Sequence, residues 1–72
     1  MPNYHINIFY SNEDECFVAD IPDLMYCSAL GDTPEQALAE VIIAKKIWIE
    51  SAIADGQTIP EAKYCPVIYK VG

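Results

Sequence analysis

Apolar and polar residues alternate over residues 4–10, and one side of this stretch carries Tyr4, Ile6, Ile8 and Tyr10. Because successive side chains of a strand point to opposite faces, the alternation predicts a strand with one mostly apolar face. A polar turn over residues 11–15 follows, and residues 16–21 return as a second strand that is apolar on both faces. Residues 27–30 add a short third strand. Consecutive strands of this kind predict an antiparallel meander.

A helix start follows the third strand directly. Thr33 suits the N-cap because its hydroxyl can accept a hydrogen bond from the first turn. Pro34 then falls at N1, where its missing N–H costs nothing, and Gln36 at N3 completes a capping box. The periodic run continues to Asp55, and Gly56 suits the C′ position. The sequence therefore predicts a helix of about 22 residues, roughly 33 Å long.

The predicted helix has a broad apolar side, which Lys45 interrupts with a stem that can lie along the sheet. That side carries Ala37, Leu38, Val41, Ile42, Ala44, Trp48, Ile49 and Ala52. The opposite side is polar except for Ile43 and Ile47, four positions apart. An exposed pair of β-branched residues at this spacing indicates a subunit or partner contact, with simple exposure as the alternative.

Residues 64–71 are a candidate last strand, which Pro66 restricts to a sheet edge or to a start at Val67. The predicted fold class is therefore α+β, in the order β-β-β-α-β. It consists of a three-stranded antiparallel meander, one long helix packed on one face, and a short C-terminal strand. We expect a single domain over residues 1–72.

A chain of 72 residues buries only about 60% of its unfolded surface, so a small domain of this size needs further stabilisation. Cys16, Cys27 and Cys65 are odd in number and widely spaced, which favours plain thiols in a reducing cytoplasm over zinc ligands or disulfides. No signal peptide or membrane span is visible. We expect a homo-oligomer, a dimer or a tetramer. It would cover the sheet face opposite the helix, where Phe9 lies with either Phe17 or Cys16 and Val18.

The chain carries 11 acidic and 4 basic residues, a net charge of −7, and no arginine. Such a surface repels a phosphate backbone, so direct nucleic-acid binding is not expected. Three of the acidic residues, Glu13, Asp14 and Glu15, stand together in the first turn. They either keep an exposed turn solvated or steer a basic partner protein toward the chain.

Candidate catalytic groups are few. His5 is the single histidine, and no nucleophile or orienting group accompanies it in the sequence. Asp20 and Asp23 bracket Ile21-Pro22 and resemble half of a metal site, but turn and strand-end roles explain them as well. No glycine-rich phosphate loop is present. We therefore expect neither catalysis nor a bound metal or cofactor.

Several segments together resemble the N-terminal domain of the HicB-type antitoxin family. They are VADIPDL at 18–24, Cys27, GDTPEQAL at 31–38, Trp48, and Asp55-Gly56 followed by Ile59-Pro60. The similarity covers residues 4–61. Their order and spacing carry the resemblance, since each helix cap alone is common.

The resemblance implies a degenerate, partial RNase H-like fold that lacks the catalytic carboxylates of that enzyme. It also implies that the chain binds and neutralises a HicA-type toxin, a small basic ribonuclease that cleaves mRNA. The acidic composition agrees with such a partner. The residues that we expect at a partner or subunit interface are Glu13, Asp14, Glu15, Asp20, Asp23, Ile43 and Ile47.

Two departures from the family pattern stand out. Met25-Tyr26 occupies the place where the family commonly has Pro-Gly, so that turn should differ. The chain also ends at Gly72, where full-length antitoxins continue into a DNA-binding domain, so operator binding is not expected. Two alternatives to an antitoxin stay open at this point. One is an orphan oligomeric scaffold without a toxin, and the other is a metal-dependent nuclease remnant using Asp20 and Asp23.

Overall fold

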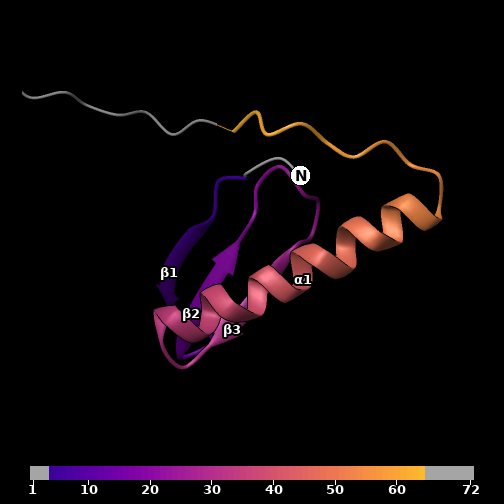
Figure 1. Ribbon diagram of the computed structural model, residues 1–72. Helices are drawn as coiled ribbons and strands as arrows, with labels where there is room; N and C mark the ends of the chain where they lie inside the picture. The colour runs from indigo at the N-terminus through magenta and orange to yellow at the C-terminus, as the bar shows by residue number, and fades with distance from the viewer. Residues whose placement is uncertain (1–3, 65–72) are drawn as a thin grey trace, which may run out of the picture.

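A computed structural model describes residues 4–64 of the chain. Within this range, strands β1 (Asn7–Ser11), β2 (Cys16–Asp20) and β3 (Ser28–Gly31) precede one helix, α1 (Pro34–Ala54). The strands form one antiparallel sheet in the order β1-β2-β3, and α1 lies across one face of it (Figure 1). The predicted α+β meander with one long helix is therefore confirmed, whereas Cys65 and all but the first residue of the candidate strand at 64–71 lie outside the described residues.

The inner face of the sheet carries small side chains beneath the helix. Ala19 is fully buried and lies directly opposite Ile8 on β1 and Ala29 on β3. The core then continues through Ile21 and Leu24 to Val41 of α1, all almost completely buried. Alanines at the sheet centre let the helix approach closely, so the bulky side chains lie around them.

The helix does not lie over the middle of the sheet. It contacts β3 most and β1 least, so the side of α1 nearer β1 is only partly covered. Leu38 and Ile42, expected on the packed side of the helix, are exposed for this reason. Ile8 and Tyr10 on the inner face of β1 are exposed as well.

The N-terminus of α1 is capped as predicted. Thr33 has an extended backbone, and its hydroxyl accepts the N–H of Gln36 at 3.1 Å. The Gln36 amide oxygen accepts from Asp32 N–H at 2.9 Å, one residue before the N-cap rather than at it. A Cβ at Gly31 would lie 2.4 Å from the backbone nitrogen of Ala37, so this sharp entry into the helix requires glycine.

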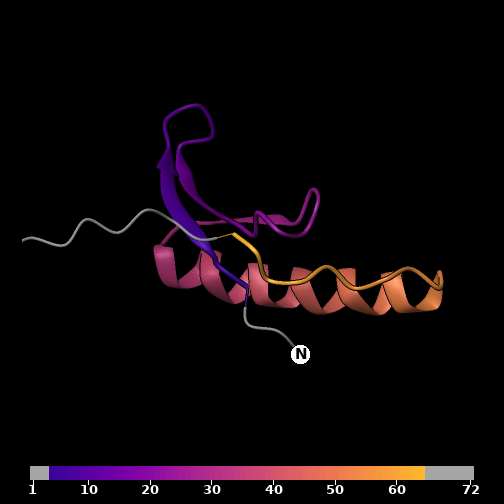
Figure 2. The same cartoon turned by 90° about the horizontal axis from the view of Figure 1, so that it is seen from above.

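The C-terminus of α1 closes with a Schellman motif. Gly56 has φ +72°, its N–H donates to Ile53 O at 3.0 Å, and Gln57 N–H donates to Ala52 O at 2.8 Å. The chain therefore reverses at the predicted residue, and residues 57–64 run back toward the start of the chain, where Pro60 accepts a hydrogen bond from Tyr4 (Figure 2). The helix itself extends past the sheet (Figure 1), and Trp48 in its second half donates a hydrogen bond to Met25 O in the β2–β3 loop.

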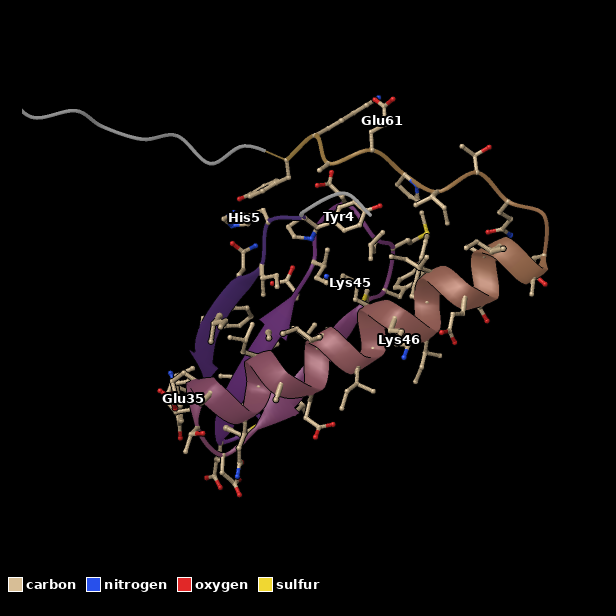
Figure 3. All side chains as sticks on the ribbon, viewed as in Figure 1. Tyr4, His5, Glu35, Lys45, Lys46 and Glu61 are labelled. Carbon is tan, nitrogen blue, oxygen red and sulfur yellow. The ribbon has the colours of Figure 1, made fainter. Side chains whose placement is uncertain are left out.

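The returning segment is fastened to the start of the chain. The buried Tyr4 donates from its hydroxyl to Pro60 O, and the backbone N–H of Tyr64 donates to the carboxylate of Asp23 at 3.1 Å. Burial, and next the negative charge of Asp23, raise the pKa of Tyr4, so its hydroxyl keeps the proton that it donates. Figure 3 shows Tyr4 beside this segment, whereas sequence alternation predicted it within β1. Tyr4 is thus buried by tertiary packing and not by strand pairing.

Candidate functional site

The face of the sheet away from α1 carries a row of apolar side chains across all three strands. Phe9 lies opposite Val18, and Val18 lies opposite Leu30. Phe9 is 50% and Leu30 54% exposed, because no element in residues 4–64 covers this face. We call Phe9, Val18 and Leu30 the apolar row. Cross-strand neighbours of this kind lie about 5 Å apart, so the row forms one continuous patch.

Acidic residues lie at both ends of the outer face. The turn between β1 and β2 exposes Glu13, Asp14 and Glu15, and it is held by Ser11, whose hydroxyl donates to the Asp14 carboxylate at 3.0 Å. At the opposite ends of the strands Asp20 stands on the same face as the row, half-buried, opposite Asn7 and Ser28. The structure thus places four of the predicted site residues around one apolar patch.

Asp23 does not belong to this face. Its carboxylate accepts the Tyr64 backbone N–H described above, which gives it a fastening role. His5 points a ring nitrogen at Asn7 Oδ1, 2.6 Å away, and its ring lies 4.7 Å from that of Tyr64. Within residues 4–64 no three His, Cys, Asp or Glu side chains are grouped to hold a metal ion. Asp20 and Asp23 therefore have separate structural surroundings.

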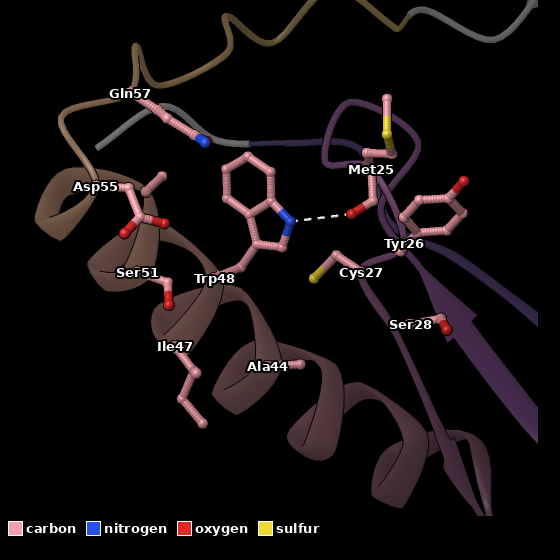
Figure 4. A pocket seen from close by; sticks show the side chains of 11 residues that line it. Met25, Tyr26, Cys27, Ser28, Ala44, Ile47, Trp48, Ser51, Asp55 and Gln57 are labelled. Atoms are coloured by element: carbon pink, nitrogen blue, oxygen red, sulfur yellow. Dashed lines mark hydrogen bonds between the residues drawn. The ribbon is translucent and has the colours of Figure 1, made fainter.

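A second apolar surface lies between the β2–β3 loop and the second half of α1, and we call it the loop–helix groove. It is an open hollow of about 580 Å³. Its lining residues are Met25, Tyr26, Cys27, Ser28, Ala44, Ile47, Trp48, Ser51, Ala52, Asp55 and Gln57. Figure 4 shows the Trp48 indole spanning from helix to loop, where Nε1–H donates to Met25 O at 2.9 Å. Ile47, one of the predicted interface residues, lines the groove, and Ile43 lies one helical turn before it.

The groove is poor in charge. Among its lining residues, all of which belong to the described part of the chain, Asp55 is the one with a charged side chain. Cys27 is buried at its edge, and burial raises the pKa of this thiol, an effect that the nearby Lys45 partly offsets. Lys45 is half-buried, as expected of a stem lying along the sheet. The groove therefore offers apolar contact area with little electrostatic preference for a charged ligand.

The sequence pattern singles out the acidic turn and Ile47 as candidate interface residues but not the loop side of the groove. Met25 is 70% and Tyr26 96% exposed, whereas the sequence predicts only that their turn differs from the family pattern. Tyr26 also has φ +61°, a left-handed conformation in which glycine is favoured. The available signal was the replacement of Pro-Gly by Met25-Tyr26, since two large apolar residues in a tight connection are unusual there.

No helix in the described part of the chain is long and apolar enough to cross a membrane. Residues 4–70 match the family described as HicB-like antitoxin of bacterial toxin–antitoxin systems. The chain is also 41% identical over 58 residues to a UPF0150 protein of Synechocystis sp., covering 81% of this chain and 78% of that protein. No solved structure matches it significantly. The chain therefore belongs to the HicB-like antitoxin family.

Proposed function

We propose that this chain is a non-enzymatic antitoxin that binds and neutralises a small basic toxin of the HicA type, a ribonuclease that cleaves mRNA. Membership of the antitoxin family supports the role. The observation that carries the proposal in the structure is the uncovered apolar row with acidic residues at both ends. Such a surface suits a partner with an apolar centre and a basic rim.

Charge decides which partner suits the outer face. A second copy of this chain also has a net charge of −7 and would bring Glu13–Glu15 and Asp20 toward its own acidic groups. Like charges placed against each other at an interface cost several kcal/mol. A basic protein would instead gain from the same groups, which also attract it over distances of about a Debye length. We therefore assign the outer face to the toxin, and not to the second copy of this chain that the sequence alone led us to expect there.

Neutralisation follows from competition for cations. A ribonuclease must hold the phosphates of its substrate with Lys or Arg side chains. Carboxylates beside the apolar row would occupy the same cations, while Phe9 and Leu30 exclude water from the contact. The antitoxin would thus mask the RNA-binding surface without catalysing any reaction and without a cofactor. Because mRNA is the target of the toxin, the proposed place of action is the cytoplasm.

The proposal extends to the fold. The order β-β-β-α over residues 7–54 supports a partial RNase H-like fold, as the family resemblance implies. In that arrangement the antitoxin would keep the sheet and first helix of the enzyme as a binding platform. The Asp23 carboxylate, which accepts a backbone N–H, would serve there as a fastening and not as a metal ligand.

The test begins with the small basic reading frame that neighbours this gene. Expressed alone it should arrest growth, and co-expression of this chain should restore growth and yield a complex that co-purifies. Phe9→Ser should weaken the complex about 30-fold or more, because a central aromatic contact is worth 2 kcal/mol or more. Ile53→Ser is the matched control, since Ile53 is 62% exposed at the far end of α1. Absence of rescue and of co-purification with the wild-type chain would refute the proposal.

A further inference from the structure

Tyr26 stands out because its backbone conformation is unfavourable and its side chain is almost fully exposed among residues 4–64. Its φ of +61° places a large side chain in the left-handed region, which costs a non-glycine residue about 1–2 kcal/mol. The side chain is 96% exposed, so no packing within residues 4–64 offsets that cost. Strained residues persist mainly where function uses them. We therefore expect Tyr26 to make a contact with another molecule.

Tyr26 stands beside a hollow that an aromatic ring could enter. Met25 and Tyr26 project from one rim of the loop–helix groove, and Ala44, Ile47 and Trp48 of α1 form the other side (Figure 4). The loop is held in position, because Trp48 Nε1–H donates to Met25 O at 2.9 Å and Cys27 N–H donates to Leu24 O at 3.2 Å. The protomer therefore presents an apolar projection and an apolar hollow next to each other.

We propose that the loop–helix groove is the surface through which two copies of this chain associate, with Met25 and Tyr26 of each copy seated in the groove of the other. A projection and a hollow on the same patch are self-complementary under a two-fold axis. Such an isologous contact closes after two copies. This inference does not depend on the proposed toxin, since both partners are this chain.

Charge favours a second copy over a basic partner at this surface. Only Asp55 among the lining residues is charged, and Lys46 and Glu50, which flank Ile47 along α1, balance each other. The acidic turn Glu13–Glu15 lies at the opposite end of the antiparallel sheet from the β2–β3 loop (Figure 1). Two acidic copies can thus meet at the groove with less repulsion than at the outer face, and a basic protein finds little charge there to attract it.

The contact must extend beyond the groove to be stable. A standard interface buries about 800 Å² on each partner. Ile43 and Ile47, exposed on the same flank of α1, continue the apolar surface from the groove toward the middle of the helix. The interface that we infer therefore includes the β2–β3 loop and this helical flank, with Tyr26 and Trp48 near its centre.

The experiment measures self-association of the full chain by sedimentation equilibrium and by fluorescence. Trp48 is the single tryptophan, and it lines the groove, so its emission should shift to the blue over the concentration range in which dimers form. Tyr26→Gly and Ile47→Ser should each raise the dissociation constant of the dimer at least tenfold. The Trp48 emission should then shift at a correspondingly higher protein concentration. Ile53→Ser, at an equally exposed position of α1 outside the groove, should change the dissociation constant of the dimer less than twofold.

Glu15→Gly is the matched control for strain. Glu15 is the other non-glycine residue with a left-handed backbone in residues 4–64, at φ +52°, and it lies far from the groove. Its replacement should leave the dimer intact. An 8 kDa monomer at all concentrations up to about a millimolar would overturn the proposal. A dimer that Phe9→Ser disrupts, but Tyr26→Gly and Ile47→Ser do not, would also overturn it. So would a chain that stays monomeric and loses its binding to a basic partner protein when Tyr26 is replaced by Gly.

Discussion

The apolar row and the loop–helix groove are both exposed apolar surfaces of a small acidic protein, yet they differ in charge. The row lies between the acidic turn Glu13–Glu15 and Asp20, whereas the groove carries only Asp55. Apolar contact area is therefore available at both, and the surrounding charge selects what can approach. A chain of net charge −7 meets its own copies most easily where it is least acidic.

The two surfaces also differ in how the backbone builds them. The row follows from regular pairing, because Phe9, Val18 and Leu30 are opposite residues of three paired strands. The groove exists because α1 extends past the sheet and because the β2–β3 loop holds Tyr26 at φ +61°. A regular sheet face thus suits a broad contact, and an irregular loop beside a helix suits a specific fit between projection and hollow.

Salt should separate the two surfaces most strongly. Between about 0.01 M and 0.5 M salt the Debye length falls from about 30 Å to under 10 Å, so steering toward the acidic ends of the outer face disappears. Association with the proposed basic toxin should slow ten- to a hundredfold. Self-association at the groove should stay constant or become tighter, because salt screens the repulsion between copies. Stopped-flow mixing measures the association with the toxin, and sedimentation measures the self-association. Equal weakening of both associations by salt would contradict the proposed difference in charge between the two surfaces.

The cysteines report on the two surfaces separately. Cys16 shares a shallow hollow with Leu30 beside the row, and Cys27 lines the groove. In a Cys65→Ser background, raising the protein concentration should slow alkylation of Cys27 about tenfold and leave Cys16 unchanged, while toxin should protect Cys16 only. Since burial raises the pKa of Cys27, its reaction should be followed at several values above pH 8, by peptide mass spectrometry. Protection of both thiols by either partner would show that the surfaces are not independent.

Tyr26→Gly should stabilise the monomer. The substitution removes left-handed strain worth about 1–2 kcal/mol but adds freedom to the unfolded chain, for a net gain of about 0.5–1 kcal/mol. Urea unfolding at a protein concentration too low for dimers to form measures this change in the free energy of unfolding. Glu15→Gly should give a similar gain at the outer face, although only Tyr26→Gly should weaken the dimer. A loss of stability on Tyr26→Gly would mean that the ring is used inside the protomer.

The sequence predicted the fold well where the determining interactions are local. Thr33, Pro34 and Gly56 set the ends of α1 through hydrogen bonds within a few residues, and the structure has the helix at those ends. Alternation predicted the strands, but it extended the first one to Tyr4. Alternation cannot distinguish a residue paired in a sheet from one buried by the returning segment at Pro60.

The sequence predicted an apolar outer face of the sheet, but the strand register was needed to say which side chains lie on it. Phe9 was expected beside either Phe17 or Val18, and the pairing of β1 with β2 selects Val18. The exposure of Leu38 and Ile42 depends on the lateral position of α1 over β3, which helical periodicity does not encode. The groove depends on the same position and on one left-handed residue in a loop. Long-range placement of the helix, and not the residue pattern, therefore decides both features.

The acidic turn gives the smallest expected effect and the sharpest test of the outer face. Replacing Glu13 and Glu15 by Gln and Asp14 by Asn takes the net charge from −7 to −4, and an Asn oxygen can still accept from Ser11. If the turn steers the toxin, association should slow several-fold and lose part of its salt dependence, with dissociation nearly unchanged. The control neutralises Glu50, Asp55 and Glu61, three exposed carboxylates away from the row, with the same change in net charge. Equal slowing in both variants would assign the effect to total charge. An unchanged rate in the first, measured by stopped-flow at low salt, would leave the turn as a solvated connection beside the apolar row.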